Sequence, residues 1–286
     1  MNVKIIEDRL KQYSPASPRE ELNALKEIFQ EIALFGLARA NFFNKAAFQG
    51  GSCLRIAFGL NRFSEDLDFT LFERNSDFVW APFLKTLQQE FNLYDLKFDV
   101  IDRSEADKAV KMAFLKDSSF GRVFIFTHPR GNADSNVIKI KLEVDTNPPK
   151  GSRFEKQFIN FPSTFSITTQ DLPSLFAGKC HALLCRQYIK GRDWFDFVWY
   201  VSRKIVPNYE YLTNTIDQQG PWRKQNIVVT KDWLIEALIE KIEQIDWDVA
   251  KRDAANFLRE SESESLELWG KDFFLAMVKK FSEIAD

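Results

Sequence analysis

The stretch Gly50-Gly51-Ser52-Cys53-Leu54-Arg55, followed closely by Ser64-Glu65-Asp66-Leu67-Asp68-Phe69, decides how this chain is expected to fold. The second segment has the alternation of a β-strand, in which residues two apart project to the same face. Asp66 and Asp68 are therefore expected to project together, while Leu67 and Phe69 enter the core. The first segment reads as a glycine turn that leads into a helix.

Two carboxylates on one face of a strand suit Mg²⁺, which keeps its other coordination positions for water and substrate phosphates. A solvated strand end would look the same, so this pair alone does not identify a site. The glycines add evidence, because they let the backbone approach a ligand and because amides at a helix start donate to anionic oxygens. Together the two segments predict a site that holds a nucleotide's phosphates beside a magnesium ion.

A Gly-Ser pair followed by an Asp-x-Asp resembles the signature of DNA polymerase β-like nucleotidyltransferases. The doubled glycine before Ser52, then Leu54-Arg55 and residues 62–69, are similar to the AbiEii/AbiGii branch, the toxins of bacterial toxin–antitoxin and phage-defence systems. That branch carries a second signature, a lysine on a helix followed by Arg-Asp-x-x-Asp. Here Lys179 is followed by Arg192-Asp193-Trp194-Phe195-Asp196.

The resemblance implies a role for each motif residue. The catalytic set would be Asp66, Asp68, Lys179 and Asp196, with Lys179 neutralising charge on the triphosphate and Asp196 bonding Lys179 or ordering the nucleotide. The nucleotide would contact Gly51, Ser52, Arg55 and Lys179. Structural roles explain some of these residues equally well. Arg192 and Asp196 have the spacing of a helical ion pair. Arg55 and Arg62, which flank the first motif, could contact phosphate or acceptor RNA or could simply cover the surface.

The strand expected over residues 138–145 offers the third metal ligand. Its apolar residues alternate with Lys139, Lys141, Glu143 and Asp145. A solvated sheet face with cross-strand ion pairs would show the same pattern. The resemblance implies that this strand lies beside the Asp-x-Asp strand and supplies a carboxylate, for which we prefer Glu143 over Asp145, since Asp145 also suits a turn.

The expected fold is α/β: a polymerase β-like nucleotidyltransferase core with a mixed sheet and N-terminal helices in residues 1–150, and a helical domain in residues 151–286 that completes the active site. Hydrophobic periodicity predicts a long helix over residues 19–37 and another near residues 78–91. It predicts strands near residues 67–72, 96–101, 110–115, 123–127 and 137–144. From residue 171 onward the pattern is helical, with a start signal at Asp171.

Composition bounds the remaining possibilities. A net charge of −2 argues against binding polyanions through a global field, so an RNA partner would need a local basic patch. The absence of a long apolar run and of a leader predicts a protein that meets no membrane and stays in the cytoplasm. The unpaired spacing of Cys53, Cys180 and Cys185 fits reduced, buried thiols, and the 28 Phe predict an aromatic core.

The chain is therefore expected to be a Mg²⁺-dependent nucleotidyltransferase toxin that transfers NMP from NTP, releasing pyrophosphate. The resemblance implies tRNA as acceptor, modified at its 3′ end, and a cognate antitoxin as partner. One alternative is the same chemistry on a small molecule or a protein hydroxyl. Another is a non-catalytic nucleotide-binding module, against which the intact Asp66, Asp68, Ser52 and Lys179 argue.

Overall fold

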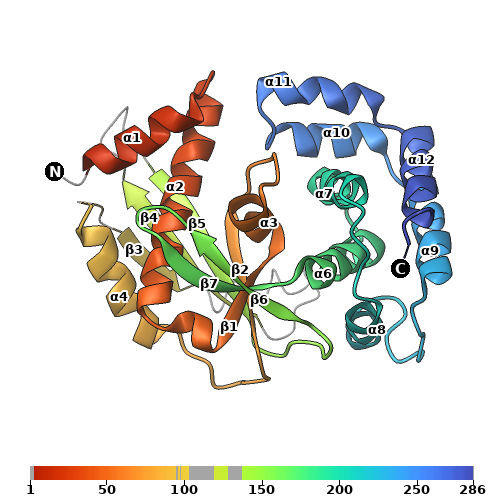
Figure 1. Cartoon of the computed structure of the whole chain (residues 1–286), viewed down its shortest axis with the longest axis horizontal. Helices are drawn as coiled ribbons and strands as arrows, with labels where there is room; N and C mark the ends of the chain where they lie inside the picture. The colour runs from red at the N-terminus through yellow and green to blue at the C-terminus, as the bar shows by residue number, and fades with distance from the viewer. Residues whose placement is uncertain (1–2, 95, 97, 103–118, 128–136, 286) are drawn as a thin grey trace. The chain divides into compact units, whose positions relative to one another are not determined.

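Strand β2 (Asp66–Leu71) lies in the middle of a mixed β-sheet (Figure 1). The computed structural model describes residues 3–94, 96, 98–102, 119–127 and 137–285, and within them the strand order is β3-β4-β5-β2-β1-β7-β6. Strand β2 pairs antiparallel with β1 and parallel with β5. Asp66 and Asp68 are half-buried while Leu67 and Phe69 are buried, which confirms the predicted alternation.

The predicted strands near residues 67, 96, 123 and 137 are confirmed to within a few residues, and the one over residues 110–115 lies outside the described residues. Three further strands were not predicted, namely β1, β6 and β7. Of these, β1 is only four residues long, and β6 is an edge strand that is mostly open to solvent. The remaining bounds are β1 (Ala46–Gln49), β3 (Phe98–Asp102), β4 (Ser119–Thr127), β5 (Val137–Asp145), β6 (Phe154–Ile159) and β7 (Phe165–Gln170).

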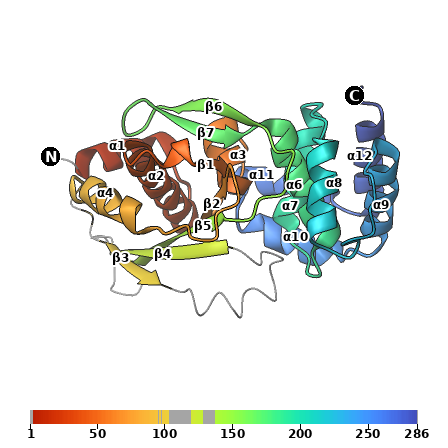
Figure 2. The same ribbon diagram turned by 90° about the horizontal axis from the view of Figure 1, so that it is seen from below.

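The N-terminal half of the chain also contains the longer helices α1 (Val3–Tyr13), α2 (Pro18–Arg39) and α4 (Ala81–Asn92). Helix α2 packs against both α1 and α4 (Figure 2). Helix α2 begins where the Ser17 side chain accepts a hydrogen bond from the Glu20 amide and Pro18 takes the first turn. The short helix α3 (Gly50–Phe58) packs on β2, and a single 3₁₀ turn covers Phe42–Asn44. These elements bring the glycine turn against the Asp-x-Asp strand.

An aromatic cluster fills the core beneath β2. The ring of Phe42 stacks on Trp80 at a centroid distance of 5.4 Å and meets Phe69 edge-on at 4.9 Å and Phe83 at 5.1 Å. Burial of each such ring contributes about 1.5–3 kcal/mol. The predicted aromatic core is thus confirmed, and it anchors Phe69 on the strand that carries the two carboxylates.

The chain divides into two compact units. The first comprises Met1–Gly59, Phe63–Pro148 and Phe154–Thr169, and the second comprises Leu60–Arg62, Pro149–Arg153 and Gln170–Asp286. The first unit therefore includes residues 154–169, which the sequence-based division at residue 150 assigned to the C-terminal part. Residues 60–62, only a few positions before Asp66, are counted with the second unit.

The second unit is helical, as the pattern from residue 171 predicted. Helix α6 starts at Asp171, whose side chain accepts from the Ser174 amide at 2.9 Å. Helix α7 packs against α6 and α10, and Trp194 on α7 meets Phe274 at a centroid distance of 5.1 Å. The bounds are α6 (Leu172–Cys185), α7 (Gly191–Ser202), α8 (Tyr209–Gln218), α9 (Lys231–Glu243), α10 (Trp247–Ala255), α11 (Glu260–Ser263), a 3₁₀ helix (Glu264–Leu268) and α12 (Lys271–Ser282).

Two expectations based on composition can be compared with the structure. No helix in the described part of the chain is long and apolar enough to cross a membrane. Cys53, Cys180 and Cys185 are free and buried, as expected for inert thiols. Burial raises the pKa of the Cys185 thiol to about 12, so this thiol stays protonated at neutral pH.

Candidate active site

The two acids of the Asp-x-Asp motif stand at the start of β2, on one face of the sheet. In the parallel pairing with β5, Asp66 lies opposite Lys141 and Asp68 lies opposite Glu143. Directly opposite residues of adjacent strands share a face, so Asp66, Asp68 and Glu143 are on the same side of the sheet. The prediction that the strand carrying Glu143 runs beside the Asp-x-Asp strand is confirmed.

The glycine turn lies directly against Asp68. Gly50 adopts φ +80°, a left-handed conformation that favours glycine, and a Cβ added there would come within 2.5 Å of Asp68 Oδ2. The strand β1 ends at this turn, with Gln49 opposite Asp68, and α3 begins with Gly50. Gly51 and Ser52 are therefore amides of the first turn of α3, next to the carboxylates.

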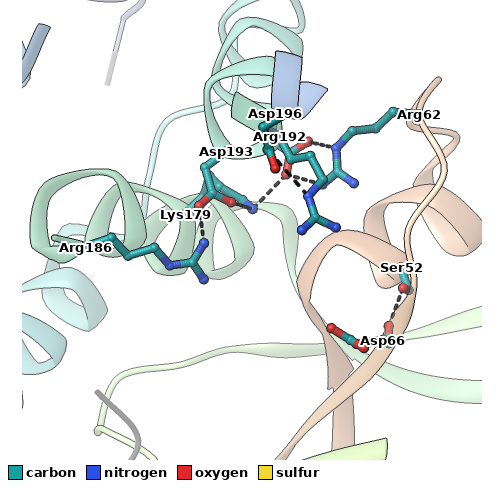
Figure 3. Close-up of polar contacts among 9 residues, drawn as sticks. Ser52, Arg62, Asp66, Lys179, Arg186, Arg192, Asp193 and Asp196 are labelled. Carbon is teal, nitrogen blue, oxygen red and sulfur yellow. Dashed lines mark hydrogen bonds and ion pairs between the residues drawn. The ribbon is translucent and has the colours of Figure 1, made fainter. Parts of the chain in front are cut away.

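Ser52 is buried, and its hydroxyl donates a hydrogen bond to the backbone carbonyl of Asp66 (Figure 3). This bond ties the N-terminal turn of α3 to the start of β2. A serine hydroxyl has one proton to donate, so contact with a phosphate oxygen would come from the Ser52 amide or from a rotated hydroxyl. The nucleotide-binding role of Ser52 stays a prediction.

The third carboxylate has two candidates that differ in their contacts. Glu143 forms an ion pair with Lys141 at 2.5 Å, and the exposed fractions of the two side chains are 16% and 25%. Asp145, at the end of β5, accepts a hydrogen bond from the Asn147 amide at 3.0 Å, which is the turn-forming role considered for it. The metal-binding role of Glu143 stays a prediction.

Carboxylate oxygens are the donors that Mg²⁺ prefers, so Asp66, Asp68 and Glu143 fit this ion by chemistry and by their common face. Within the described ranges, no three His, Cys, Asp or Glu side chains already surround a point where a metal would bind. Glu143 is paired with Lys141 through Oε1.

Arg55, predicted to contact the nucleotide, makes contacts within the first unit. Its Nε donates to Glu27 Oε2 at 2.8 Å, and its guanidinium lies 4.8 Å from the centroid of the Phe63 ring. The side chain is 16% exposed. These contacts link α3 to α2 and to the loop before β2, and a role in nucleotide binding stays a prediction.

The second signature forms an ion cluster within the second unit. The Nζ atom of Lys179 on α6 lies 2.6 Å from Asp193 Oδ1 and 2.7 Å from Asp196 Oδ2, both on α7 (Figure 3). Asp196 also accepts two hydrogen bonds of 2.6 Å from Arg62. Arg62 and Asp196 are buried, so Arg62 does not have the surface role considered for it.

Positive charge dominates the surroundings of Asp193. Burial alone would raise the pKa of this carboxyl, but Lys179, Arg186 and Lys190 outweigh burial and hold the pKa well below its usual range. Arg186 also forms an ion pair with Asp193. The Arg192 amide donates a hydrogen bond to Asp253 Oδ2 at 3.1 Å.

Lys190 is a member of this cluster that sequence reasoning missed. Burial lowers its pKa to about 8, against the opposing attraction of Asp193. It directly precedes the Arg-Asp-x-x-Asp motif, yet a lysine before a glycine gives no signal of burial. The next residue, Gly191, lies against the backbone of Ala250 on α10, which leaves no room for a side chain there.

The fold is that of the nucleotidyltransferase toxins. The chain is similar to MenT4, a nucleotidyltransferase toxin from Mycobacterium tuberculosis H37Rv, with 12% identity, a TM-score of 0.57 and coverage of 100% of this chain and 91% of that one. It is also similar to a putative nucleotidyltransferase from H. pylori, with 15% identity, a TM-score of 0.50 and coverage of 91% and 96%. No curated protein matches.

Residues 32–276 match the family described as nucleotidyl transferase AbiEii toxin, type IV TA system. The chain belongs to this family of nucleotidyltransferase toxins. The matched range contains both signatures, from Gly50 to Asp196. Membership implies a nucleotide substrate and a cognate antitoxin.

Proposed function

We propose that this toxin transfers NMP from an NTP to the 3′ end of tRNA, with Mg²⁺ as cofactor. The observation that carries the proposal is the register of β2 and β5, which sets Asp68 opposite Glu143 and puts Asp66 on the same face, beside the amides of the Gly50 turn. Acids and phosphate-binding amides side by side are what nucleotidyl transfer requires.

Asp66, Asp68 and Glu143 would hold the metal. When bound, Mg²⁺ offsets negative charge on the phosphate oxygens of the NTP. The Gly51 and Ser52 amides would donate to those oxygens and orient the α-phosphorus for in-line attack by the acceptor hydroxyl. Asp145 ends strand β5, and Glu143 lies two residues before it on the same face. Glu143 would accept the proton of that hydroxyl as general base.

We infer that Lys179 acts on the triphosphate, as the family motif implies. Its side chain is 12% exposed and is held by Asp193 and Asp196, so it would share its three donors between these acids and a phosphate oxygen. The charge of Lys179 would then offset the charge that develops as pyrophosphate leaves. Asp196 would act by holding Lys179 rather than by touching the nucleotide.

The first experiment supplies each labelled NTP in turn, with Mg²⁺ and either total tRNA or a pool of small metabolites. The expected result is label on tRNA that is lengthened at its 3′ end, with release of pyrophosphate. Label on a metabolite or on protein would select the alternative acceptors, and no pyrophosphate release with any NTP would select the non-catalytic module. Asp68→Asn serves as the control, because it keeps the size of the side chain but removes its charge.

The second experiment concerns the cell. Expression of the wild-type chain without its antitoxin should arrest bacterial growth, and Asp66→Asn should not. RNA from arrested cells should contain tRNA with extended 3′ ends. Arrest that depends on Asp66 but leaves tRNA ends normal would move the target to another acceptor.

A further inference from the structure

Three consecutive backbone carbonyls lead into the metal-binding strand, and each accepts a hydrogen bond from a buried side chain. The Nε2 atom of Gln30 on α2 donates to the carbonyls of Ser64 at 3.0 Å and Glu65 at 2.8 Å. The hydroxyl of Ser52 donates to the carbonyl of Asp66. Gln30 and Ser52 are each 1% exposed.

These side chains act where the sheet offers β2 less support. The register of β1 with β2 runs from Ala46 opposite Leu71 to Gln49 opposite Asp68, where β1 gives way to the glycine turn. Asp66 and Leu67 extend beyond that end and pair with β5 on the other side. The hydrogen bonds from Gln30 and Ser52 therefore hold the segment where β1 no longer does.

Neighbouring residues on α2 strengthen the same attachment. Lys26, one helical turn before Gln30, forms an ion pair of 3.0 Å with Glu65. Glu27, the residue after Lys26, forms the ion pair with Arg55. Lys26, Glu27 and Gln30 of α2 thus hold both the start of β2 and helix α3, which begins at the glycine turn.

We propose that Gln30 is a positioning residue for the metal site: its carboxamide fixes the peptide groups on either side of Glu65 and thereby the direction in which the Asp66 carboxylate leaves the strand. A primary amide suits this task because its two N–H groups can serve two carbonyls at once. Groups that hold metal ligands in their orientation without touching the metal commonly matter to metal affinity almost as much as the ligands. Gln30 lies outside the matched residues 32–276.

The proposal rests on the proposed metal site, and its test measures metal binding directly. Mn²⁺ replaces Mg²⁺ as a probe, and its dissociation constant is measured by titration calorimetry on the full chain without nucleotide. Gln30→Met keeps the length of the side chain and removes both donors. Gln88→Met, at an exposed position of α4, is the matched control.

Gln30→Met should weaken Mn²⁺ binding by about 10–100-fold, as is typical when a group that orients a metal ligand is removed. Gln88→Met should bind Mn²⁺ like the wild type. In the transfer assay the Gln30 variant should need more Mg²⁺, and raising the Mg²⁺ concentration should restore its turnover, a rescue that general loss of folded protein would not give.

An unchanged dissociation constant in folded Gln30→Met would overturn the positioning role while leaving the metal site intact. If that variant does not fold, Gln30→Glu, which has nearly the same shape, is measured by the same criteria. Failure of both variants to fold would also overturn the proposal, because Gln30 would then support the whole unit rather than one carboxylate. A wild type that binds no Mn²⁺ would overturn the metal site itself.

Discussion

The guanidinium of Arg62 and the carboxylate of Asp196 form a two-pronged ion pair, in which Nε and Nη2 each lie 2.6 Å from a carboxylate oxygen. The exposed fractions of these side chains are 3% and 0%. Asp196 also binds Lys179, so its oxygens serve cations on two elements of the second unit. A buried acid in this setting is costly to leave without its partners.

Arg62→Met should therefore destabilise the second unit by about 3–5 kcal/mol, because it removes one partner of a buried pair and leaves the other. Urea denaturation followed by tryptophan fluorescence measures this change, since Trp194 lies on the same helix as Asp196. Arg223→Met, at an exposed position, is the control and should change stability by less than about 0.5 kcal/mol. Equal stability of the two variants would mean that the pair contributes nothing to folding.

Lys179 and Arg186 allow a matched comparison, because both form ion pairs with Asp193 and Lys179 is also paired with Asp196. Lys179→Met should lower kcat by about 10²–10³-fold if its charge stabilises the transition state. Arg186→Met should leave kcat within a small factor of the wild type. Steady-state kinetics below the melting temperature of both variants checks this, and an equal loss in both would assign the effect to Asp193 rather than to Lys179.

Alanine substitutions at Gly50 and Gly59 would distinguish the effect of backbone strain from the effect of contact with Asp68. Both have positive φ, +80° and +74°, but a Cβ would meet Asp68 only at Gly50, and at Gly59 it would meet nothing within 4 Å. Each alanine substitution should cost about 1–2 kcal/mol for its left-handed backbone. Gly50→Ala alone should also displace the Asp68 carboxylate and abolish transfer. Thermal melting and activity, measured side by side, test this, and an active Gly50→Ala would show that the turn can yield.

Glu31 predicts a pH dependence of stability in the first unit. Burial raises its pKa from 4.5 to about 7, in spite of the opposing hydrogen bond from Arg9. Between these values the folded state binds more protons than the unfolded state, so the contribution of Glu31 is fully present below pH 4.5 and is lost as pH rises through 7. The free energy of unfolding should fall by about 2–3 kcal/mol across this window from this group alone.

Glu31→Gln, which stays neutral at every pH, should flatten that part of the stability curve. Glu73→Gln, at an exposed position of the same unit, should leave the curve unchanged and is the control. Urea denaturation at a series of pH values from 4.5 to 7 provides the measurement. A Glu31→Gln curve parallel to that of the wild type would show that Glu31 titrates at the same pH in both states.

The sequence predicted the parts of the fold whose pattern is local. The alternation around Asp66 and the N-cap signal at Asp171 each depend on a few neighbouring residues, and the structure confirms both the strand and the helix start. The short strand β1 was missed because four residues are too few for a period to appear. Strand β6 was missed because an exposed edge strand carries no regular apolar face.

Contacts between distant residues were beyond a reading of one sequence. Gln30 and the carbonyls it serves are more than thirty positions apart, and Arg62 and Asp196 are separated by 134. Glu143 could be proposed because a strand with alternating charge was expected beside the Asp-x-Asp strand, but the exact partner of Asp68 depends on register, which only the structure supplies.

The two units are interleaved along the chain, and this determines when during synthesis each unit can be completed. The first unit contains Phe154–Thr169 and the second contains Leu60–Arg62, so neither is complete when residue 148 has been synthesised. Until β7 follows, β1 lacks its parallel neighbour, and until Asp196 follows, Arg62 lacks the acid that it binds in the finished fold. A chain that stops near residue 148 therefore completes neither unit, and it is expected to lack transfer activity.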